Sequence, residues 1–208
     1  METSMDMAQI ESDIQKKLVG FCKLLPLHLN CWKATLAELQ DPVRVLINFC
    51  EQLRFVEEAS IDYIDNFISM QKALQLKILG CIEEELLTIK THFEKLTRFN
   101  SDLKNRLAVL ERATVDLDWD ADSSVVKGSP TQPRLDYLLQ MGYEFWLFFS
   151  EASKNMSSIL KAPDIRDGKF SERLKQAFSL DLQPLEENNR IYLLLALTQY
   201  VSGDKNVA

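Results

Sequence analysis

Glycine and proline are both scarce in this chain, with six of each among 208 residues. These two residues interrupt helices and supply most tight turns, so their scarcity is what a protein of long helices with few connections would show. The prolines also stand mostly between segments of helical periodicity. We therefore predict an all-α fold.

Long hydrophobic runs are missing as well. The longest apolar stretch, Ile191 to Leu197, is far shorter than the roughly 20 residues of a membrane-spanning helix. The first residues, Met1 to Asp6, lack a basic region followed by an apolar run, so we expect no secretory signal. The few cysteines then fit reduced core thiols of a cytosolic or nuclear protein better than a disulfide set. They are Cys22, Cys31, Cys50 and Cys81.

An excess of basic residues is also absent. The 24 Lys and Arg residues are outnumbered by 31 Asp and Glu residues, which gives a formal net charge of -7. Because nucleic-acid affinity depends largely on clustered cations, this balance opposes a direct phosphate-binding surface. A role near RNA or DNA would have to work through other proteins.

Catalytic and metal-binding signatures are missing too. The two histidines, His28 and His92, have no CxxC or HExxH spacing near them, and the isolated glycines form no phosphate loop. The run Glu83 to Glu85 is typical of a solvated helix face. We predict no enzymatic activity, no cofactor and no metal.

An alternating acidic series, Asp116 to Asp122, superficially resembles a calcium loop. An EF-hand loop that started at Asp116 would require Gly at position 121 and Glu at position 127. This chain has Ala121 and Lys127 there. We therefore interpret the segment as part of a solvated loop over residues 118–132.

What the sequence does have is an apolar series with unbroken spacing of four and three. If Ile82 is position d of a heptad, every later member falls on position a or d, which predicts a coiled-coil arm within a helix of about residues 69–117. Such a seam buries side chains against another helix and leaves no cleft for chemistry. The series is Ile82, Leu86, Ile89, Phe93, Leu96, Asn100, Leu103, Leu107, Leu110, Thr114 and Leu117.

Asn100 is the most informative departure from this apolar rule. A buried amide at position a lowers stability unless another polar group meets it, and it would then fix the register of the helices. Alternatively, Asn100 lies at a hydrated place while Phe99 and Leu103 cover the seam. Neither interpretation indicates catalysis.

A second seam follows the loop, in a helix predicted from Pro133 to about Leu160. We expect it to form an antiparallel hairpin with the arm, with Gly142 and Ala152 allowing close helix approach. Its members are Leu135, Leu138, Gly142, Phe145, Phe149, Ala152, Met156 and Ile159.

This return helix is apolar nearly all round, so more than one of its faces should be covered. Tyr143, Trp146 and Phe148 lie outside the seam. Either the first two helices cover them, or they form a partner-binding site, because aromatic residues are enriched in binding hot spots.

The full prediction is one elongated helical domain over residues 1–208. Its N-terminal helices span 8–58, with a kink or break at Pro26 and a new helix starting at Asp41-Pro42. A coiled-coil hairpin spans 60–160, with Ser60 a possible cap for the segment before the arm. C-terminal helices span 163–208: a short one with Phe170, Leu174, Ala177 and Phe178, and a last one after Pro184.

The order of several short segments resembles the AIRIM family of small helical ribosome-maturation factors. The resemblance covers most of the chain and is weakest from Pro163 to Asp181. The segments are Phe21 with Pro26, Cys31 to Leu36, Asn48 to Leu53, Phe67 at the start of the arm, Ser129-Pro130 and Met156 to Leu160.

The resemblance implies a non-enzymatic adaptor that associates with AAA+ ATPase subunits and with the helical protein CINP. It implies a role in cytoplasmic maturation of the large ribosomal subunit, where assembly factors are released and recycled, with indirect contact to ribosomal precursor particles. The alternative is a structural coiled-coil subunit of a kinetochore or vesicle-tethering assembly, which would show the same heptads and acidity.

Overall fold

The protein is described here by a computed structural model that covers the chain except residues 1, 62–64, 131, 183–193 and 197–208. The all-α class is confirmed, since the described part consists of helices and connections with one isolated bridge between Ser129 and Gln132. The helices are α1 (Glu2–Glu58), α2 (Phe67–Ala113), α3 (Ser124–Lys127), α4 (Leu135–Lys161) and α5 (Gly168–Phe178).

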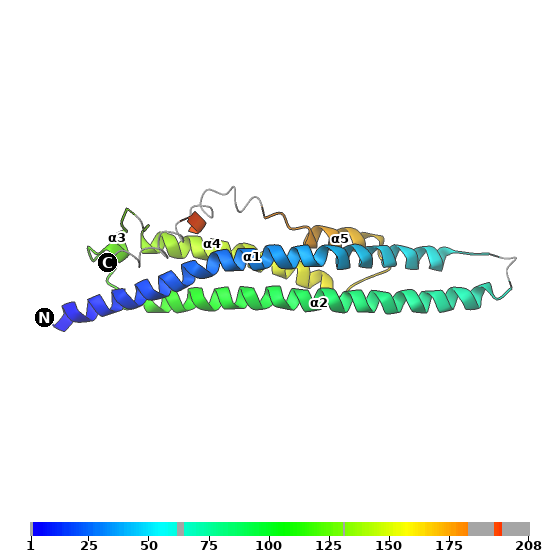
Figure 1. Cartoon of the computed structure of the whole chain (residues 1–208), viewed down its shortest axis with the longest axis horizontal. Helices are drawn as coiled ribbons and strands as arrows, with labels where there is room; N and C mark the ends of the chain where they lie inside the picture. Colours follow the sequence, from blue (N-terminus) through cyan, green and yellow to red (C-terminus); the bar gives the residue numbers. More distant parts are fainter. Residues whose placement is uncertain (1, 62–64, 131, 183–193, 197–208) are drawn as a thin grey trace. The chain divides into compact units, whose positions relative to one another are not determined.

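The chain divides into two compact units. Unit 1 comprises residues 1–32, 98–150 and 181–208, and unit 2 comprises residues 33–97 and 151–180. Helices α1, α2 and α4 each contribute residues to both units. Helices α1 and α2 pack against each other as an antiparallel pair (Figure 1). The prediction of one domain over the whole chain stays a prediction.

Helix α1 is longer than the sequence predicts. It begins at Glu2 and runs to Glu58 as one helix, so the predicted new start at Asp41-Pro42 is wrong. Of the kink or break predicted at Pro26, the break does not occur. A proline inside a helix costs about 3 kcal/mol through a lost hydrogen bond and a clash with the preceding turn. The buried face nevertheless continues on both sides of each proline, and burial of large side chains offsets that cost. The buried neighbours are Cys22, Leu25, Leu29, Leu39, Val43 and Leu46.

Helix α2 confirms the predicted seam. Nine of its eleven members are buried, and Leu86 and Phe93 are half-buried. The helix ends at Ala113 rather than near Leu117, because the chain tightens into turns in which the Thr114 N–H donates to the Glu111 carbonyl at 3.0 Å. Leu117 is still buried after the helix has ended. At the other end α2 begins at Phe67, close to the start predicted near residue 69, and Asn66 before it has a φ of 64°.

The seam of α2 packs against more helices than the predicted hairpin contains. Within unit 1, Asn100 of α2 contacts both Trp32 of α1 and Phe149 of α4. The prediction paired the seam with the return helix, with the preceding helices or another subunit as other possible partners. The structure adds α1, which is the long antiparallel partner of α2.

The loop over residues 118–132 is more ordered than predicted. It contains the single-turn helix α3, in which the Ser123 side chain accepts a hydrogen bond from the Val126 N–H. Val125 and Val126 are both buried. The interpretation as a solvated surface segment therefore fails for this turn, because two adjacent β-branched side chains anchor it in unit 1.

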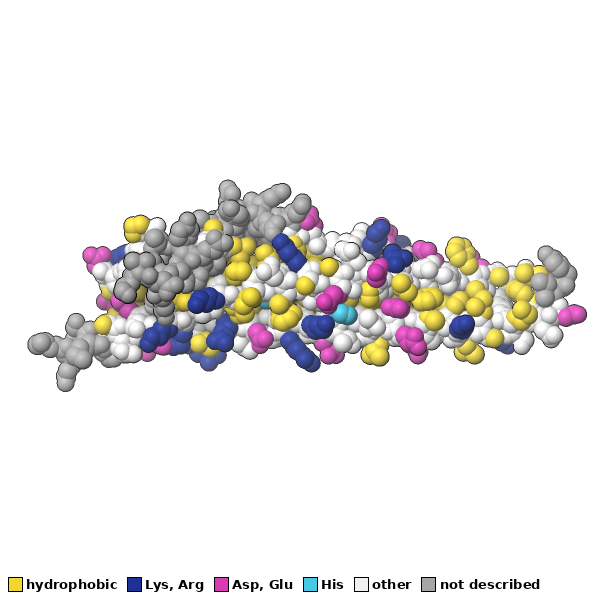
Figure 2. Space-filling view, in the orientation of Figure 1, with side chains coloured by type: hydrophobic (Ala, Val, Ile, Leu, Met, Phe, Trp, Pro, Cys, Tyr) yellow, Lys and Arg dark blue, Asp and Glu magenta, His cyan; other side chains and the backbone are white. Residues whose placement is uncertain are grey.

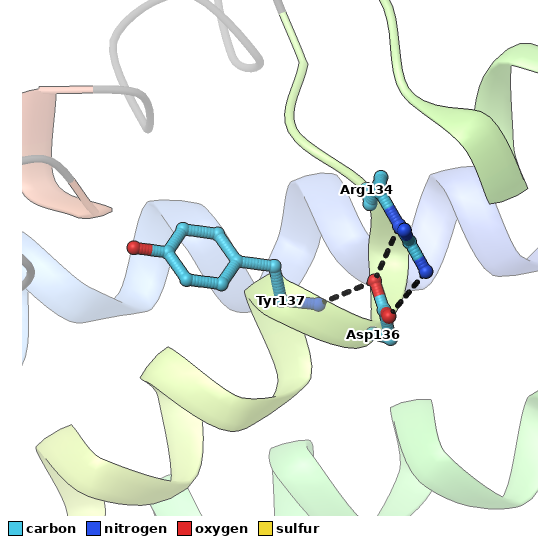
Figure 3. Close-up of polar contacts among 3 residues, drawn as sticks. All are labelled: Arg134, Asp136 and Tyr137. Atoms are coloured by element: carbon cyan, nitrogen blue, oxygen red, sulfur yellow. Dashed lines mark hydrogen bonds and ion pairs between the residues drawn. The ribbon is translucent and has the colours of Figure 1, made fainter.

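Helix α4 begins two residues later than predicted, after an exposed polar arrangement (Figure 3). The Asp136 carboxylate pairs with the Arg134 guanidinium at 2.7 Å and accepts the Tyr137 N–H at 2.8 Å. The Tyr137 ring points away from this pair. A carboxylate in the first turn is favourable next to the helix dipole, although an exposed ion pair adds at most about 1 kcal/mol.

In unit 2, the short helix predicted after Pro163 is confirmed as α5. Its predicted apolar residues, Phe170, Leu174, Ala177 and Phe178, are all buried. Arg166, just before it, pairs with Glu57 of α1 at 2.9 Å. The predicted last helix lies mostly outside the described residues; within them, 194–196 are helical and Leu194 is buried.

Gly142 is the point of closest helix approach in unit 1, as the sequence predicts. A Cβ at this position would lie 2.8 Å from two ring atoms of Phe21 and 3.4 Å from Leu107. Its nearest neighbour is thus on α1, and not on the arm as expected. Phe21 is only 2% exposed, so its ring has little room to move.

We expect Gly142→Ala to destabilise the protein by about 1 to 3 kcal/mol through overpacking against Phe21. The matched control is Gly20→Ala on α1, where a Cβ would meet nothing within 4 Å. The control should gain up to about 1 kcal/mol of helix propensity. Urea unfolding monitored by circular dichroism measures both, and equal stability changes would contradict the close-approach account.

Candidate functional site

The most specific arrangement in unit 1 is a buried polar contact among three helices. The Trp32 indole Nε1–H donates to the Asn100 Oδ1 at 3.2 Å, and the Asn100 Nδ2 donates to the Phe149 carbonyl at 3.0 Å. Trp32 is fully buried and Asn100 is 7% exposed. The interpretation of Asn100 as lying at a hydrated place therefore does not hold. We call these three residues the polar node.

The polar node exists because each helix supplies one complementary group. The heptad places Asn100 on the buried face of α2, and a buried indole N–H needs an acceptor. The Phe149 carbonyl has two lone pairs, so it can accept from Asn100 in addition to a helical donor. Moving any of the three helices by one turn would break these bonds. The register role of Asn100 remains a prediction, and this geometry supports it.

An aromatic cluster surrounds the polar node. The Phe149 ring centroid lies 4.8 Å from that of Trp32, 5.0 Å from that of Phe145 and 4.6 Å from that of His28. His28 is 3% exposed, and its Nε2 has no hydrogen-bond partner within the described residues. Burial lowers the pKa of His28 from 6.5 to about 4, against the opposing effect of the Phe99 backbone. The imidazole is therefore neutral near neutral pH.

The predicted partner-binding residues do not form one patch. Tyr143 is 48% exposed, and its ring centroid lies 5.4 Å from that of Trp146, which is half-buried. The Lys104 ammonium of α2 lies 5.3 Å from the centroid of the Trp146 ring, a cation–π geometry. Phe148 follows Trp146 by two residues and so lies on a different face, with its ring 5.2 Å from Phe149. We call Tyr143, Trp146 and Lys104 the aromatic pair with its lysine.

The concave surfaces of unit 2 do not bring together groups for chemistry. A groove of about 580 Å³ between α1 and α5 has both acidic and basic side chains along it, including Glu51, Arg54, Glu172 and Lys175. In the part of the chain that the structure describes, no three His, Cys, Asp or Glu residues are grouped as a metal site. None of the described helices is long and apolar enough to cross a bilayer.

Two cysteines are buried core thiols, one in each unit. Burial raises the pKa of Cys22 to about 12 and that of Cys50 to about 11. Both side chains are 1% exposed. Because the thiolate is the nucleophilic form, these two thiols are inert in the folded protein. Cys31 and Cys81 are half-buried.

Sequence reasoning missed three participants in these arrangements. The need of a buried Trp32 indole for an acceptor on another helix was not used to find Asn100. His28 was considered only as a metal ligand. Lys104 lies one residue after the seam position Leu103, and no local pattern distinguishes it from other exposed lysines. The contact between Trp32 and Asn100 could have been found from the rule that buried indoles are hydrogen-bonded.

We expect Asn100→Leu to destabilise the protein by about 1 to 3 kcal/mol, because it leaves the Trp32 N–H buried without an acceptor. Adding Trp32→Phe should then cost less than it does alone, which a double-mutant cycle measures as a coupling energy. Asn105→Leu, on the exposed side of α2, is the control and should change stability by less than about 0.5 kcal/mol. Additive effects of the two node substitutions would contradict this account.

A second prediction concerns the pH dependence of stability. Because the folded pKa of His28, about 4, lies below its unfolded value of 6.5, the unfolded chain binds the extra proton between these pH values. Lowering the pH from 7 to 5 should therefore cost about 2 kcal/mol through this residue. His28→Leu should remove that part of the pH dependence, whereas His92→Gln should not. Unfolding curves at both pH values test this, and an unchanged pH dependence in His28→Leu would contradict it.

Comparison with models of known protein families matches most of the chain. The model of the CA109-like family, described as ribosome biogenesis protein C1orf109-like, matches residues 12–190. No curated protein matches the chain. The match includes the polar node, the aromatic cluster and all of α2, α4 and α5. It confirms the resemblance predicted from the sequence. The chain therefore belongs to the CA109-like family of ribosome biogenesis proteins.

Proposed function

We propose that the protein is a non-enzymatic adaptor that links AAA+ ATPase subunits to precursors of the large ribosomal subunit in the cytoplasm. In this role it assists the release and recycling of assembly factors and contacts precursor particles through other proteins. Membership of a ribosome biogenesis family supports a role in ribosome maturation. The net charge of -7 supports indirect rather than direct contact with RNA.

The observation that carries the adaptor role is the exposed aromatic surface on α4. Tyr143 is 48% exposed beside Trp146, and Lys104 lies over the Trp146 ring. Aromatic and basic side chains of this kind are enriched among residues that dominate binding energy. We propose that this aromatic pair with its lysine binds a second helical protein, a CINP-like subunit or an AAA+ ATPase subunit. Phe148 is on another face and need not take part.

The test compares Tyr143→Ala and Trp146→Ala with Phe148→Ala as a control of similar size on the same helix. We expect the first two to weaken binding by about 2 kcal/mol or more and to change the melting temperature little. The fully buried Phe149→Ala should instead lose about 3 to 5 kcal/mol of stability. Partner recovery with a tagged full chain and thermal melting provide the two measurements.

Recovery of AAA+ ATPase subunits with the wild-type chain, and their loss with Tyr143→Ala, would support the proposal. Recovery of cytoskeletal or membrane-tethering subunits instead would favour the alternative function, a structural coiled-coil subunit of a kinetochore or vesicle-tethering assembly. If Trp146→Ala melts normally and still recovers every partner, this surface is not the binding site.

A further inference from the structure

Unit 2 exposes hydrophobic side chains over the end of α1 and the start of α2 (Figure 2). On α2, Leu76 is 71% exposed and Leu87 is 67% exposed. Ala73 and Gly80 are exposed on the same side of α2. These four residues, which we call the outer stripe, recur at steps of three, four and seven. That is the spacing of a coiled-coil seam in which Glu83 occupies the position between Gly80 and Leu87.

The outer stripe lies opposite the buried face of α2. Leu76 and Gly80 are each two residues from the buried Ile78, and two residues correspond to about 200° around a helix. Relative to the heptad of the buried seam, the outer stripe occupies positions b and e, which are normally polar in a helix that packs on one side. An apolar series at b and e indicates a helix built to pack on two sides.

Gly80 is not required by the fold itself. A Cβ at this position would meet nothing within 4 Å, and glycine destabilises an exposed helix relative to alanine. A small residue at the centre of an exposed seam instead permits close approach by an external helix.

The charges beside the outer stripe select the kind of helix that fits. Lys72 and Lys77 flank its N-terminal half, whereas Glu83 and Glu84 flank its C-terminal half. All four side chains are exposed, and none forms an ion pair with the residues that the structure describes. Lys72 and Glu83 are three turns apart on one flank, and Lys77 and Glu84 are two turns apart on the other.

This order is self-complementary in an antiparallel arrangement. In an antiparallel pair, the flank that carries Lys72 and Glu83 faces the same flank of the second copy, and the flank that carries Lys77 and Glu84 does likewise. Lys72 then lies near Glu83 of the second copy, and Lys77 lies near Glu84 of the second copy. A parallel copy would place like charges together. We propose that the outer stripe is an antiparallel, two-fold interface between two copies of this chain, centred near Leu79 and Gly80.

Charge reversal in the full chain tests this interface. Sedimentation velocity from about 1 to about 100 µM chain, a range suited to a small interface, should show a monomer–dimer equilibrium. Lys72→Glu with Lys77→Glu, or Glu83→Lys with Glu84→Lys, should weaken the dimer at least tenfold through like-charge contacts. Combining all four reversals in one chain should restore it. Mixing the two doubly substituted chains should yield a one-to-one heterodimer.

Gly80→Leu provides an independent variant, because the open space at this position lets the monomer accept the side chain. It should weaken the dimer while leaving helix content and melting temperature unchanged or raised. A wild-type chain that stays monomeric throughout this range, or a dimer insensitive to both charge reversals, would overturn the proposal. So would association of the outer stripe only with a different protein. The adaptor proposal does not depend on these outcomes, because it rests on α4 in unit 1.

Discussion

One buried amide in unit 1 forms hydrogen bonds with two neighbouring helices, and we predict that the alignment of the three helices depends on it. Asn100 accepts from the indole of Trp32 and donates to the backbone of Phe149, so it connects α1, α2 and α4 at one level. Apolar contacts alone would tolerate sliding by one turn, because leucines along a seam are nearly interchangeable. The two directional bonds are satisfied in only one alignment, and an unsatisfied buried polar group costs about 1 to 3 kcal/mol.

The close approach of helices near the polar node follows from the same alignment. Gly142 faces Phe21 only while α1 and α4 keep their present register. The rings of His28, Phe145 and Phe149 then pack against one another beside the node. Specific packing and a neutral histidine are thus consequences of one arrangement.

Much of this fold follows from spacing alone. Heptad positions predicted which side of α2 is buried, since burial depends only on the face to which a residue belongs. The same reasoning could not say which helix covers that face, because any apolar seam fits another. It also failed at Pro42, where it started a new helix, and the break that it allowed at Pro26 does not occur. At both positions a local cost competes with burial of distant side chains that a sequence does not display. Loop composition likewise hid Val125 and Val126 among polar neighbours.

The candidate site was harder to predict than the fold. The aromatic excess on α4 was visible, but whether its members share a face required counting around the helix, and this separates Phe148 from Tyr143 and Trp146. Lys104 comes from another helix and has no sequence signal. The binding role of these residues remains a prediction, whereas their arrangement is an observed property of unit 1.

The two buried thiols, Cys22 and Cys50, can also report local unfolding of the protein. Cys22 lies in unit 1 and Cys50 in unit 2, and each is shielded by its own surroundings. A thiol-specific reagent can modify them only when the local structure opens, so the modification rate of each residue measures the opening equilibrium of its unit. Cys31 and Cys81, half-buried, supply internal standards for fast labelling. Peptide-resolved labelling could therefore establish whether the units open together or separately, without any engineered probe.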